Sequence, residues 1–317
     1  MTLFLSEEDV KSLLTMPMAL EAIEAVHREH AQGRLIDTPR HRTRLPQTVM
    51  HMLTAAIPSL GVMGYKVYTT NREGARFFVH LFDVASGKPT AVIAADYLGM
   101  MRTGAIGGIA AKWLAREDAQ TAGVFGSGWQ AQSQIEALCA VRPIKHIKVF
   151  ARNAEKLRAF CERMTQKTGR AVRPATSAEA TVKDSDIVVT ITGAVTPLFE
   201  GEWLTPGAHV TAAGSNSLIR REIDETTVRR SKPVCVDSRA VALKECGDLL
   251  PLLEKGYLHA DQLSEIGEVI AGMRPGRAAA QDITLFESHG MAIQDLAVAQ
   301  RVLALARERG LGSDLPY

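Results

Sequence analysis

The stretch Thr121-Ala-Gly-Val-Phe-Gly-Ser-Gly-Trp-Gln-Ala131 decides the fold, because a short apolar run leads directly into a glycine-rich turn. We expect a strand over Thr121–Phe125 and a helix over Gln130–Ala140, so the turn lies between a strand and a helix. The first glycine permits a tight turn, the second lets the backbone approach a pyrophosphate, and the small alanine lets the helix pack on the strand. Amide groups at the helix N-terminus then face the phosphates. The predicted dinucleotide site therefore consists of Gly126, Ser127, Gly128, Trp129, Gln130 and Ala131.

The sequence after this turn alternates between apolar runs and segments with helical spacing. Such alternation is typical of a parallel, doubly wound sheet with helices on both faces, which places the chain in the α/β class. The expected strands are 146–150, 171–174, 186–190, 209–213 and 233–236, and the expected helices are 154–167 and 177–183.

The end of the second expected strand selects between NAD and NADP. An acidic residue about 20 positions after the glycines binds the ribose 2′-hydroxyl of NAD, whereas an arginine accommodates the 2′-phosphate of NADP. Here Lys148-Val149-Phe150 runs into Ala151-Arg152-Asn153, without a carboxylate. We expect Arg152 and Asn153 to contact the cofactor, with NADP preferred and NAD as the alternative.

The N-terminal part of the chain has a different pattern. Apolar residues at helical spacing over Glu7–Gln32 predict two short helices. Strand-like runs separated by turn signals follow, at 49–55, 63–68 and 77–83. These segments predict an α+β unit. A helix rich in small residues is expected over Met101–Leu114, and a long helix over 292–307.

Composition and charge exclude several classes of function. The 317 residues carry a formal net charge of +2, with lysine and arginine spread along the chain, so we expect no nucleic-acid partner. The most apolar stretch, Ala91–Leu114, is interrupted by Asp96, Arg102 and Lys112, which argues against a membrane span. The N-terminus lacks the basic and apolar segments of a signal peptide. A small polar molecule is the expected partner.

The cysteines indicate a reducing compartment. None of the four forms a Cys-x-x-Cys pair or has a histidine at metal-ligand spacing, so we expect no metal centre. Reduced, mostly buried thiols of this kind are typical of a cytoplasmic protein. The cysteines are Cys139, Cys161, Cys235 and Cys246.

Further motifs follow one another in a fixed order along the chain. They are Gly64-Tyr-Lys66, Met101-Arg-Thr-Gly-Ala105, Val236-Asp-Ser238, Leu243-Lys-Glu-Cys-Gly-Asp248, Gly267-Glu-Val-Ile-Ala-Gly272 and Gly290-Met-Ala-Ile-Gln-Asp-Leu296. Each is weak alone, whereas their order and spacing are specific. With them and the glycine-rich turn, the chain resembles the ornithine cyclodeaminase and mu-crystallin family over essentially its whole length.

The resemblance implies a domain organisation. Family members have a Rossmann-type domain inserted into a substrate-binding and dimerisation domain. We therefore expect residues 118–291 to bind NAD(P), and residues 1–117 with 292–317 to bind the substrate and to form a homodimer.

The resemblance also implies how the substrate is held. Family members hold a small α-amino or α-imino acid by its carboxylate, and the matching cations here are Arg42, Lys66 and Arg102. A guanidinium binds a carboxylate through two parallel hydrogen bonds, and lysine adds a compact charge. Arg42 is preferred over the arginines two residues before and after it because its spacing from the flanking prolines fits best. Thr103 is expected to contact the nicotinamide.

The chain departs from the cyclodeaminase pattern at two positions. Asn216, which follows Gly214 and Ser215, stands where cyclodeaminases have an aspartate that acts as acid and base. An amide forms hydrogen bonds to substrate or cofactor but does not exchange a proton near neutral pH. His51 stands where those enzymes have a glutamate, and its unperturbed pKa of about 6.5 makes it a candidate proton donor. We expect Gly214 and Ser215 to contact the cofactor, and the catalytic residues to be Lys66, Arg102, Asn216 and His51.

These features predict an NAD(P)H-dependent reductase of a small cyclic ketimine, such as 1-pyrroline-2-carboxylate or 1-piperideine-2-carboxylate, which gives proline or pipecolate. A protonated imine already carries its proton and is electrophilic, whereas deamination of a saturated amino acid needs a base. The alternatives are cyclodeamination of ornithine or lysine, an alanine dehydrogenase-like oxidation of an amino acid, and a mu-crystallin-like protein that binds without catalysis.

Overall fold

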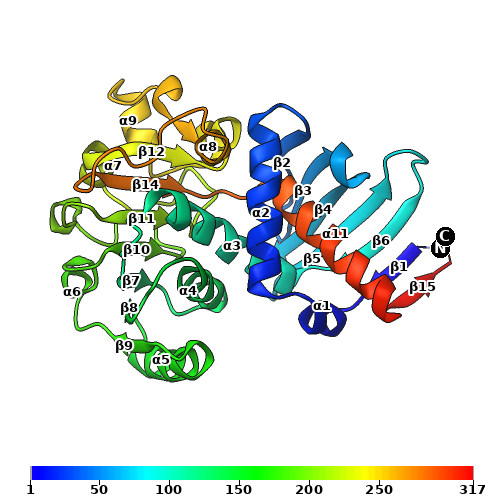
Figure 1. Ribbon diagram of the computed structural model, residues 1–317, viewed down its shortest axis with the longest axis horizontal. Helices are drawn as coiled ribbons and strands as arrows, with labels where there is room; N and C mark the ends of the chain where they lie inside the picture. Colours follow the sequence, from blue (N-terminus) through cyan, green and yellow to red (C-terminus); the bar gives the residue numbers. More distant parts are fainter. Residues whose placement is uncertain (1, 317) are drawn as a thin grey trace. The chain divides into compact units, whose positions relative to one another are not determined.

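The structure, a computed structural model, describes residues 2–316, which divide into two compact units. Unit 1 contains the chain up to Arg102 and from Gly290 onwards, and unit 2 contains Thr103–His289. In sequence, the second unit is therefore inserted into the first. Each unit is built on one sheet, and Figure 1 labels the strands and helices of both.

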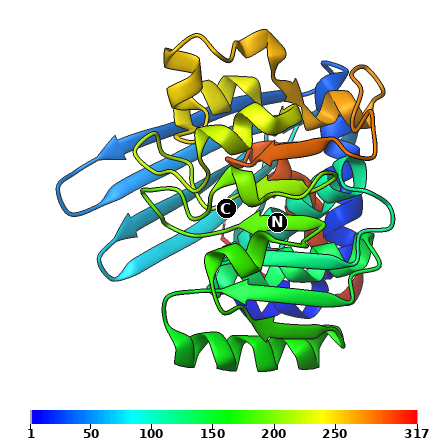
Figure 2. The same ribbon diagram turned by 90° about the vertical axis from the view of Figure 1, so that its left-hand side faces the viewer.

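Seven strands form the sheet of unit 1, in the order β15-β1-β6-β5-β4-β3-β2. Strands β2 to β5 are antiparallel to one another and form two long hairpins, which extend toward the left in Figure 2. The strands are β1 (Thr2–Leu5), β2 (Ile36–Arg44), β3 (Val49–Ile57), β4 (Val62–Asn71), β5 (Gly74–Asp83), β6 (Pro89–Ala94) and β15 (Ser313–Leu315).

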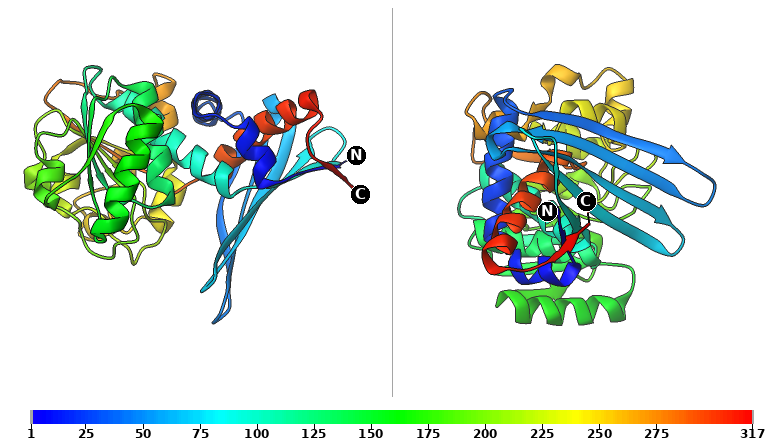
Figure 3. Two further views of the ribbon diagram at one scale, coloured as in Figure 1. Left: turned by 90° about the horizontal axis from the view of Figure 1, so that it is seen from below. Right: turned by 90° about the vertical axis from the view of Figure 1, so that its right-hand side faces the viewer.

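Helices α1 (Glu7–Leu13), α2 (Met16–Ala31) and α11 (Ala292–Arg309) lie on one face of this sheet (Figure 3, left). Along β3 every second side chain from His51 to Ile57 is buried, the period that a strand requires to present one face to a core. The two predicted N-terminal helices are confirmed. At the first of them, Ser6 Oγ accepts a hydrogen bond from the backbone N–H of Asp9 at 3.2 Å.

The opposite face of the sheet is called the open sheet face below. The cross-strand neighbours Met52, Val67 and Phe78 form one apolar row across it. Met50 is 39% exposed and Phe78 is 37% exposed, and no helix of the described part of unit 1 covers them. Polar residues on this face include Thr54, Thr69 and Arg76, and its apolar and aromatic residues include Met50, Met52, Met63, Tyr65, Val67, Phe78, His80 and Phe82.

Unit 2 contains the predicted parallel, doubly wound sheet. Its eight strands have the order β13-β12-β14-β11-β10-β7-β8-β9, and all pairs are parallel. The chain runs outward from β7 to β9 and then returns to β10 on the other side of β7. Dinucleotides bind at the carboxyl ends of the strands at such a switch point. The strands are β7 (Thr121–Phe125), β8 (His146–Phe150), β9 (Ala171–Pro174), β10 (Ile187–Thr190), β11 (His209–Ala212), β12 (Ser231–Val236), β13 (Ser264–Glu265) and β14 (Ile283–Glu287).

Two apolar cores lie on the two faces of this sheet, as expected of a doubly wound fold (Figure 3, left). One core packs α3, α4 and α5 against β7 to β10, and the other packs the shorter helices against β10 to β14. The helices are α3 (Asp96–Leu114), α4 (Trp129–Val141), α5 (Ala154–Thr168), α6 (Ala178–Val182), α7 (Glu225–Arg230), α8 (Arg239–Glu245), α9 (Leu250–Glu254) and α10 (Ile266–Ile270).

The first boundary between the units falls inside α3, after Arg102, and not after residue 117 as the sequence indicated. The reason is close packing within unit 2. A Cβ on Gly104 would lie 2.4 Å from the backbone of Ser133, and Gln134 Nε2 donates to the Thr103 carbonyl at 3.0 Å. The second half of α3 therefore belongs to the cofactor unit. No helix in the described chain is long and apolar enough to cross a membrane.

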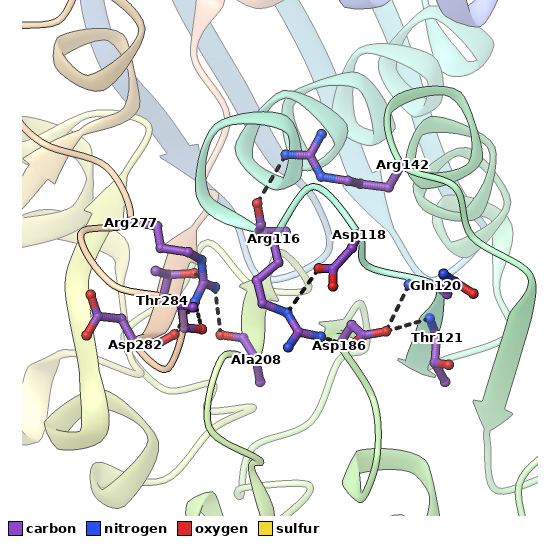
Figure 4. A network of polar contacts seen from close by, with 12 residues as sticks. Arg116, Asp118, Gln120, Thr121, Arg142, Asp186, Ala208, Arg277, Asp282 and Thr284 are labelled. Carbon is purple, nitrogen blue, oxygen red and sulfur yellow. Dashed lines mark hydrogen bonds and ion pairs between the residues drawn. The ribbon is translucent and has the colours of Figure 1, made fainter.

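A polar network ties together the amino ends of the unit 2 strands (Figure 4). Asp186, just before β10, forms an ion pair with Arg116 and accepts hydrogen bonds from the backbone N–H groups of Gln120 and Thr121 at 2.8 and 2.9 Å. Arg277 donates to the Ala208 carbonyl and to Thr284 Oγ1, both at 3.2 Å. This network holds the end of the sheet opposite to the expected ligand edge.

Candidate functional site

The glycine-rich turn has the geometry that the sequence indicated. Gly126 has a φ of 114°, and a Cβ there would lie 2.6 Å from the Ile191 carbonyl oxygen, so only glycine fits. A Cβ on Gly128 would meet nothing within 4 Å, so the backbone at the start of α4 is open to an approaching group. Ala131 is fully buried against the sheet. The turn therefore fits a pyrophosphate at the N-terminus of α4.

The tip of β8 presents one cation. Arg152 is exposed, and no residue of the described chain forms an ion pair with it. Asn153 Oδ1 accepts a hydrogen bond from the Lys156 backbone N–H at 2.9 Å, so this side chain caps α5. If Asn153 contacts the cofactor, it would do so through its side-chain NH2 group, because Oδ1 is used by the cap.

A buried carboxylate that the sequence analysis missed organises the loops after β10 and β11. Glu222 accepts hydrogen bonds from the Thr192 backbone N–H at 2.6 Å, from Gly214 N–H at 2.7 Å and from Thr190 Oγ1 at 3.0 Å. Burial raises the pKa of Glu222 to about 7 despite these hydrogen bonds. Glu222 thus fixes Gly214, and with it the start of the loop that carries Ser215 and Asn216, at the carboxyl edge of the sheet.

In unit 1 two predicted cations meet at one carboxylate. Asp295 Oδ1, on α11, accepts a hydrogen bond from Lys66 Nζ on β4 at 2.7 Å and from Arg102 Nε on α3 at 3.1 Å. The Lys66 and Asp295 side chains are only 3% and 1% exposed, and Arg102 is 13% exposed. Two cations against one anion leave one positive charge in excess. This is the arrangement that an added carboxylate would neutralise.

Burial and neighbouring charges have opposite effects on the pKa values of Lys66 and Asp295. Burial lowers the pKa of Lys66 to about 8, against the raising effect of Asp295. Burial alone would raise the pKa of Asp295, but Arg102 and Lys66 outweigh it and hold that pKa below its usual range. Asp295 is therefore ionised at neutral pH, and Lys66 is mostly protonated.

A second layer of contacts orients Arg102. Its Nη1 donates to Gln294 Oε1 at 3.0 Å, and Gln294 Nε2 lies 3.1 Å from Nε2 of the buried His27. Gly290 has a φ of 82°, and a Cβ there would lie 2.9 Å from Arg102 Nη1. Asp295 and Gln294 were not assigned a role in the sequence analysis, although both stand in the motif that begins at Gly290. The only sequence feature that could have pointed to Asp295 and Gln294 was their position in that motif.

The three arginines of β2 surround His51. Arg42 is the cross-strand neighbour of His51, so the two side chains lie on the same sheet face. Of these arginines, Arg40 is the one whose charge acts on Lys66. Arg40 is therefore a further cation whose charge reaches the cluster.

His51 does not have the expected properties of a proton donor. Burial, followed by the charges of Arg42, Arg40 and Arg44, lowers the pKa of His51 to about 4, so the ring is neutral at neutral pH. It stacks on Tyr68 with ring centroids 4.2 Å apart, and Tyr68 contacts Phe77 at 4.9 Å. Lys66 Nζ lies 5.2 Å from the Phe77 ring centroid. His51 is thus the end of a flat aromatic row beside Lys66.

Thr103 lies inside a helix, because α3 begins at Asp96 and not at Met101 as the sequence indicated. The residue is 9% exposed and its carbonyl accepts the bond from Gln134. Thr103 follows Arg102 directly, and the boundary between the two units falls between these residues.

The chain is similar to known proteins over almost its whole length. The ornithine cyclodeaminase/mu-crystallin family profile matches residues 1–310. A Delta(1)-pyrroline-2-carboxylate reductase of Bacillus cereus is 33% identical, over 99% of this chain and 100% of the relative. The structure of Thermococcus litoralis Delta(1)-pyrroline-2-carboxylate reductase in complex with NADH and L-proline has a TM-score of 0.95 and 30% identity, over 99% of this chain and 100% of that chain. An archaeal alanine dehydrogenase dimer with bound NAD has a TM-score of 0.94 and 30% identity, over 100% of this chain and 99% of that chain.

The charge cluster predicts a large stability difference between two carboxylate variants of α11. Asp295→Asn leaves Lys66 and Arg102 buried without their anion, which should lower the free energy of unfolding by about 3 to 5 kcal/mol. Glu308→Gln removes an exposed carboxylate from the same helix and should change it by less than about 0.5 kcal/mol. Urea denaturation followed by circular dichroism measures both. Equal stabilities would show that Asp295 does not hold the cluster.

Proposed function

We propose, from the premise that this chain belongs to the ornithine cyclodeaminase/mu-crystallin family, that it reduces a small cyclic ketimine carboxylate with NAD(P)H. The substrates proposed are 1-pyrroline-2-carboxylate and 1-piperideine-2-carboxylate, and the products are proline and pipecolate. The observation that carries the proposal is the buried cluster of Lys66, Arg102 and Asp295, with its one excess positive charge. The reductase from Thermococcus litoralis, which holds NADH and L-proline, supports it.

The cluster gives the substrate carboxylate its place. Arg102 is fixed by Asp295 and Gln294 through Nε and Nη1, so its Nη2 edge is left for a ligand. A guanidinium and an ammonium together provide directed hydrogen bonds and charge for one carboxylate. Arg42 and Arg40 add positive potential on the same side. The substrate carboxylate would thus offset the hydration that the buried cations have lost, and it would neutralise their excess positive charge.

The aromatic row indicates what the rest of the substrate is. Tyr68 and Phe77 with the neutral His51 offer flat, uncharged surfaces next to Lys66. A planar ring fits such surfaces, whereas the distal ammonium of ornithine finds no carboxylate on them. This favours a cyclic imine over a diamino acid as the substrate.

Asn216 indicates the direction of the chemistry. The nicotinamide cofactor supplies the hydride when bound, so the protein has to position the imine carbon and keep the imine protonated. Protonated Lys66 and the orienting amide of Asn216 suit that task. Removing hydrogen from a saturated amine instead requires a base at the amine, which an amide is not.

A substrate panel tests this function. Purified protein should oxidise NADPH or NADH with 1-pyrroline-2-carboxylate or 1-piperideine-2-carboxylate, followed by nicotinamide absorbance. Asn216→Ala should keep a measurable reductase, since a neutral hydrogen bond contributes only about 0.5 to 1.5 kcal/mol. Arg102→Ala should lose about 2 to 5 kcal/mol of transition-state stabilisation and nearly all activity. If ornithine or L-alanine is turned over with NAD faster than the imines are reduced, the proposal is contradicted. A residue other than Asn216 would then have to transfer the proton.

The pKa of Lys66 predicts a pH dependence of ligand binding. Pyrrole-2-carboxylate is a suitable probe because neither its ring N–H nor its carboxylate titrates between neutral and mildly alkaline pH. Its affinity should be constant below the Lys66 pKa of about 8, and should fall by up to about tenfold per pH unit above it, as the ammonium loses its proton. Calorimetry of wild type and Lys66→Met measures this. A flat profile for wild type would exclude Lys66 as the titrating anchor.

Cofactor preference depends on Arg152, which we propose binds the 2′-phosphate of NADP. One charge-assisted hydrogen bond contributes about 1.5 to 3 kcal/mol, so Arg152→Asp should weaken NADPH binding about tenfold or more and leave NADH nearly unchanged. Arg158→Asp is the matched control, because it changes the same charge at another exposed site near the start of α5. Fluorescence titration with each cofactor gives the dissociation constants. An equal loss for NADPH and NADH would remove the assignment.

The open sheet face predicts a homodimer. Eight apolar or aromatic side chains on one face, including the exposed Met50 and Phe78, need a cover, and a second copy provides the same surface. Light scattering should give twice the chain mass of 34.4 kDa at micromolar concentration. Phe78→Lys should shift the protein toward monomer, and Tyr257→Lys, which alters an exposed aromatic of unit 2, should not. A wild-type monomer would contradict the proposal.

A further inference from the structure

A buried group of potential metal ligands lies at the carboxyl ends of β12 and β14, outside the residues used above. Cys246 follows α8, Glu287 ends β14, and His289 comes two residues later. The Cys246 sulfur, a Glu287 carboxylate oxygen and a His289 ring nitrogen all lie within 4.8 Å of one another. The three residues are only 2%, 2% and 4% exposed.

One acceptor in this group is unsatisfied. Glu287 Oε1 is buried and has no hydrogen-bond partner. A buried, unpaired carboxylate oxygen costs free energy, so native proteins rarely keep one without a ligand or ion. The thiol of Cys246 contacts the same carboxylate and does not remove the deficit at Oε1.

A carboxylate lies next to His289. Asp237 Oδ2 accepts a hydrogen bond from the His289 backbone N–H at 2.8 Å, and Asp237 Oδ1 lies 3.5 Å from His289 Nδ1. Ser238 N–H donates to Asp237 Oδ1 at 3.0 Å. Histidine ligands of metals typically have such a carboxylate neighbour, to which the second ring nitrogen donates once the metal is bound.

The charge of the surroundings is strongly negative. Asp248 and Glu222 are buried beside Glu287, and each acts to raise the pKa of Glu287 beyond the effect of burial itself. Burial raises the pKa of the Cys246 thiol, and Glu287 raises it further. No lysine or arginine of the described chain forms an ion pair with Glu287, Asp248 or Glu222. Arg221 is a cation near Asp248, where its charge acts to lower the pKa of that carboxyl group, and its Nε donates to the Gly247 carbonyl at 3.1 Å.

We propose that Cys246, Glu287 and His289 bind one zinc ion. A thiolate, a carboxylate and a neutral imidazole are ligands that zinc accepts together, whereas magnesium and calcium prefer oxygen alone. Zinc binds these groups as a thiolate and a carboxylate, and their two negative charges equal the charge of the ion. The ion would satisfy Glu287 Oε1 and fix the chain after α8 to the end of β14. This site does not rest on the proposed function.

Metal analysis of the untagged full-length protein tests the site. Because the site is buried, zinc should enter during folding, so the protein is expressed or refolded with zinc and then dialysed against metal-free buffer. Mass spectrometry of the metal content should give one zinc per chain. Refolding with cobalt instead should give the near-ultraviolet band of a thiolate bound to cobalt, which other ligands do not produce.

Two variants complete the test. Cys246→Ser should lose the cobalt band and most of the zinc, whereas Cys235→Ser, which removes another buried thiol outside the cluster, should retain both. If Cys246→Ser does not fold, the wild-type zinc content and cobalt spectrum still decide the question. Absence of both signals in folded wild type, or an unchanged zinc content in folded Cys246→Ser, would overturn the proposal.

Discussion

A single carboxylate, Asp295, is the interaction on which the charged centre of unit 1 depends. Lys66 is 3% exposed, and burial of an ammonium is tolerated only when an anion stands beside it. The same oxygen of Asp295 also binds Arg102, so one side chain of α11 joins β4 to the first half of α3. Gln294, the preceding residue, holds the same guanidinium from another side. The positions of Lys66 and Arg102 thus depend on where α11 packs.

Unit 2 also has a buried carboxylate that joins separate segments, but this one accepts hydrogen bonds from backbone N–H groups instead of pairing with cations. Glu222 gathers the N–H groups of Thr192 and Gly214, which belong to loops after neighbouring parallel strands. The loops at the ligand edge therefore have a fixed anchor below them, while the polar network of Arg116, Asp186 and Arg277 fixes the opposite edge. Both edges of the unit 2 sheet are thus held by side-chain contacts between neighbouring strands and loops.

Much of the fold was predictable because its local signals agree with its tertiary structure. The run Thr121–Phe125 is a strand with the bounds expected, since a short apolar run, a glycine-rich turn and helical spacing follow one another there. The strand Ile283–Glu287 was missed, because five fully buried residues show no alternation to distinguish a central strand from a helix.

The candidate site was less predictable than the fold. Lys66 and Arg102 were found by family resemblance, whereas Asp295 was not assigned, because a buried aspartate in a helix has no sequence signal apart from its partners. The low pKa of His51 likewise depends on burial and then on the charges of three arginines of the neighbouring strand β2. Properties that arise from residues distant in sequence are visible only once the chain is folded.

That distance in sequence also sets an order of events during synthesis. Lys66 and Asp295 are separated by 229 positions, and all of unit 2 lies between the two segments of unit 1. A ribosome therefore completes the contiguous cofactor unit before the last helix of the other unit exists. Until α11 emerges, Lys66 and Arg102 lack their counter-ion and the sheet beneath them lacks its main cover. Unit 1 consequently stays incomplete until the end of translation, and its folding can finish only when α11 has been synthesised.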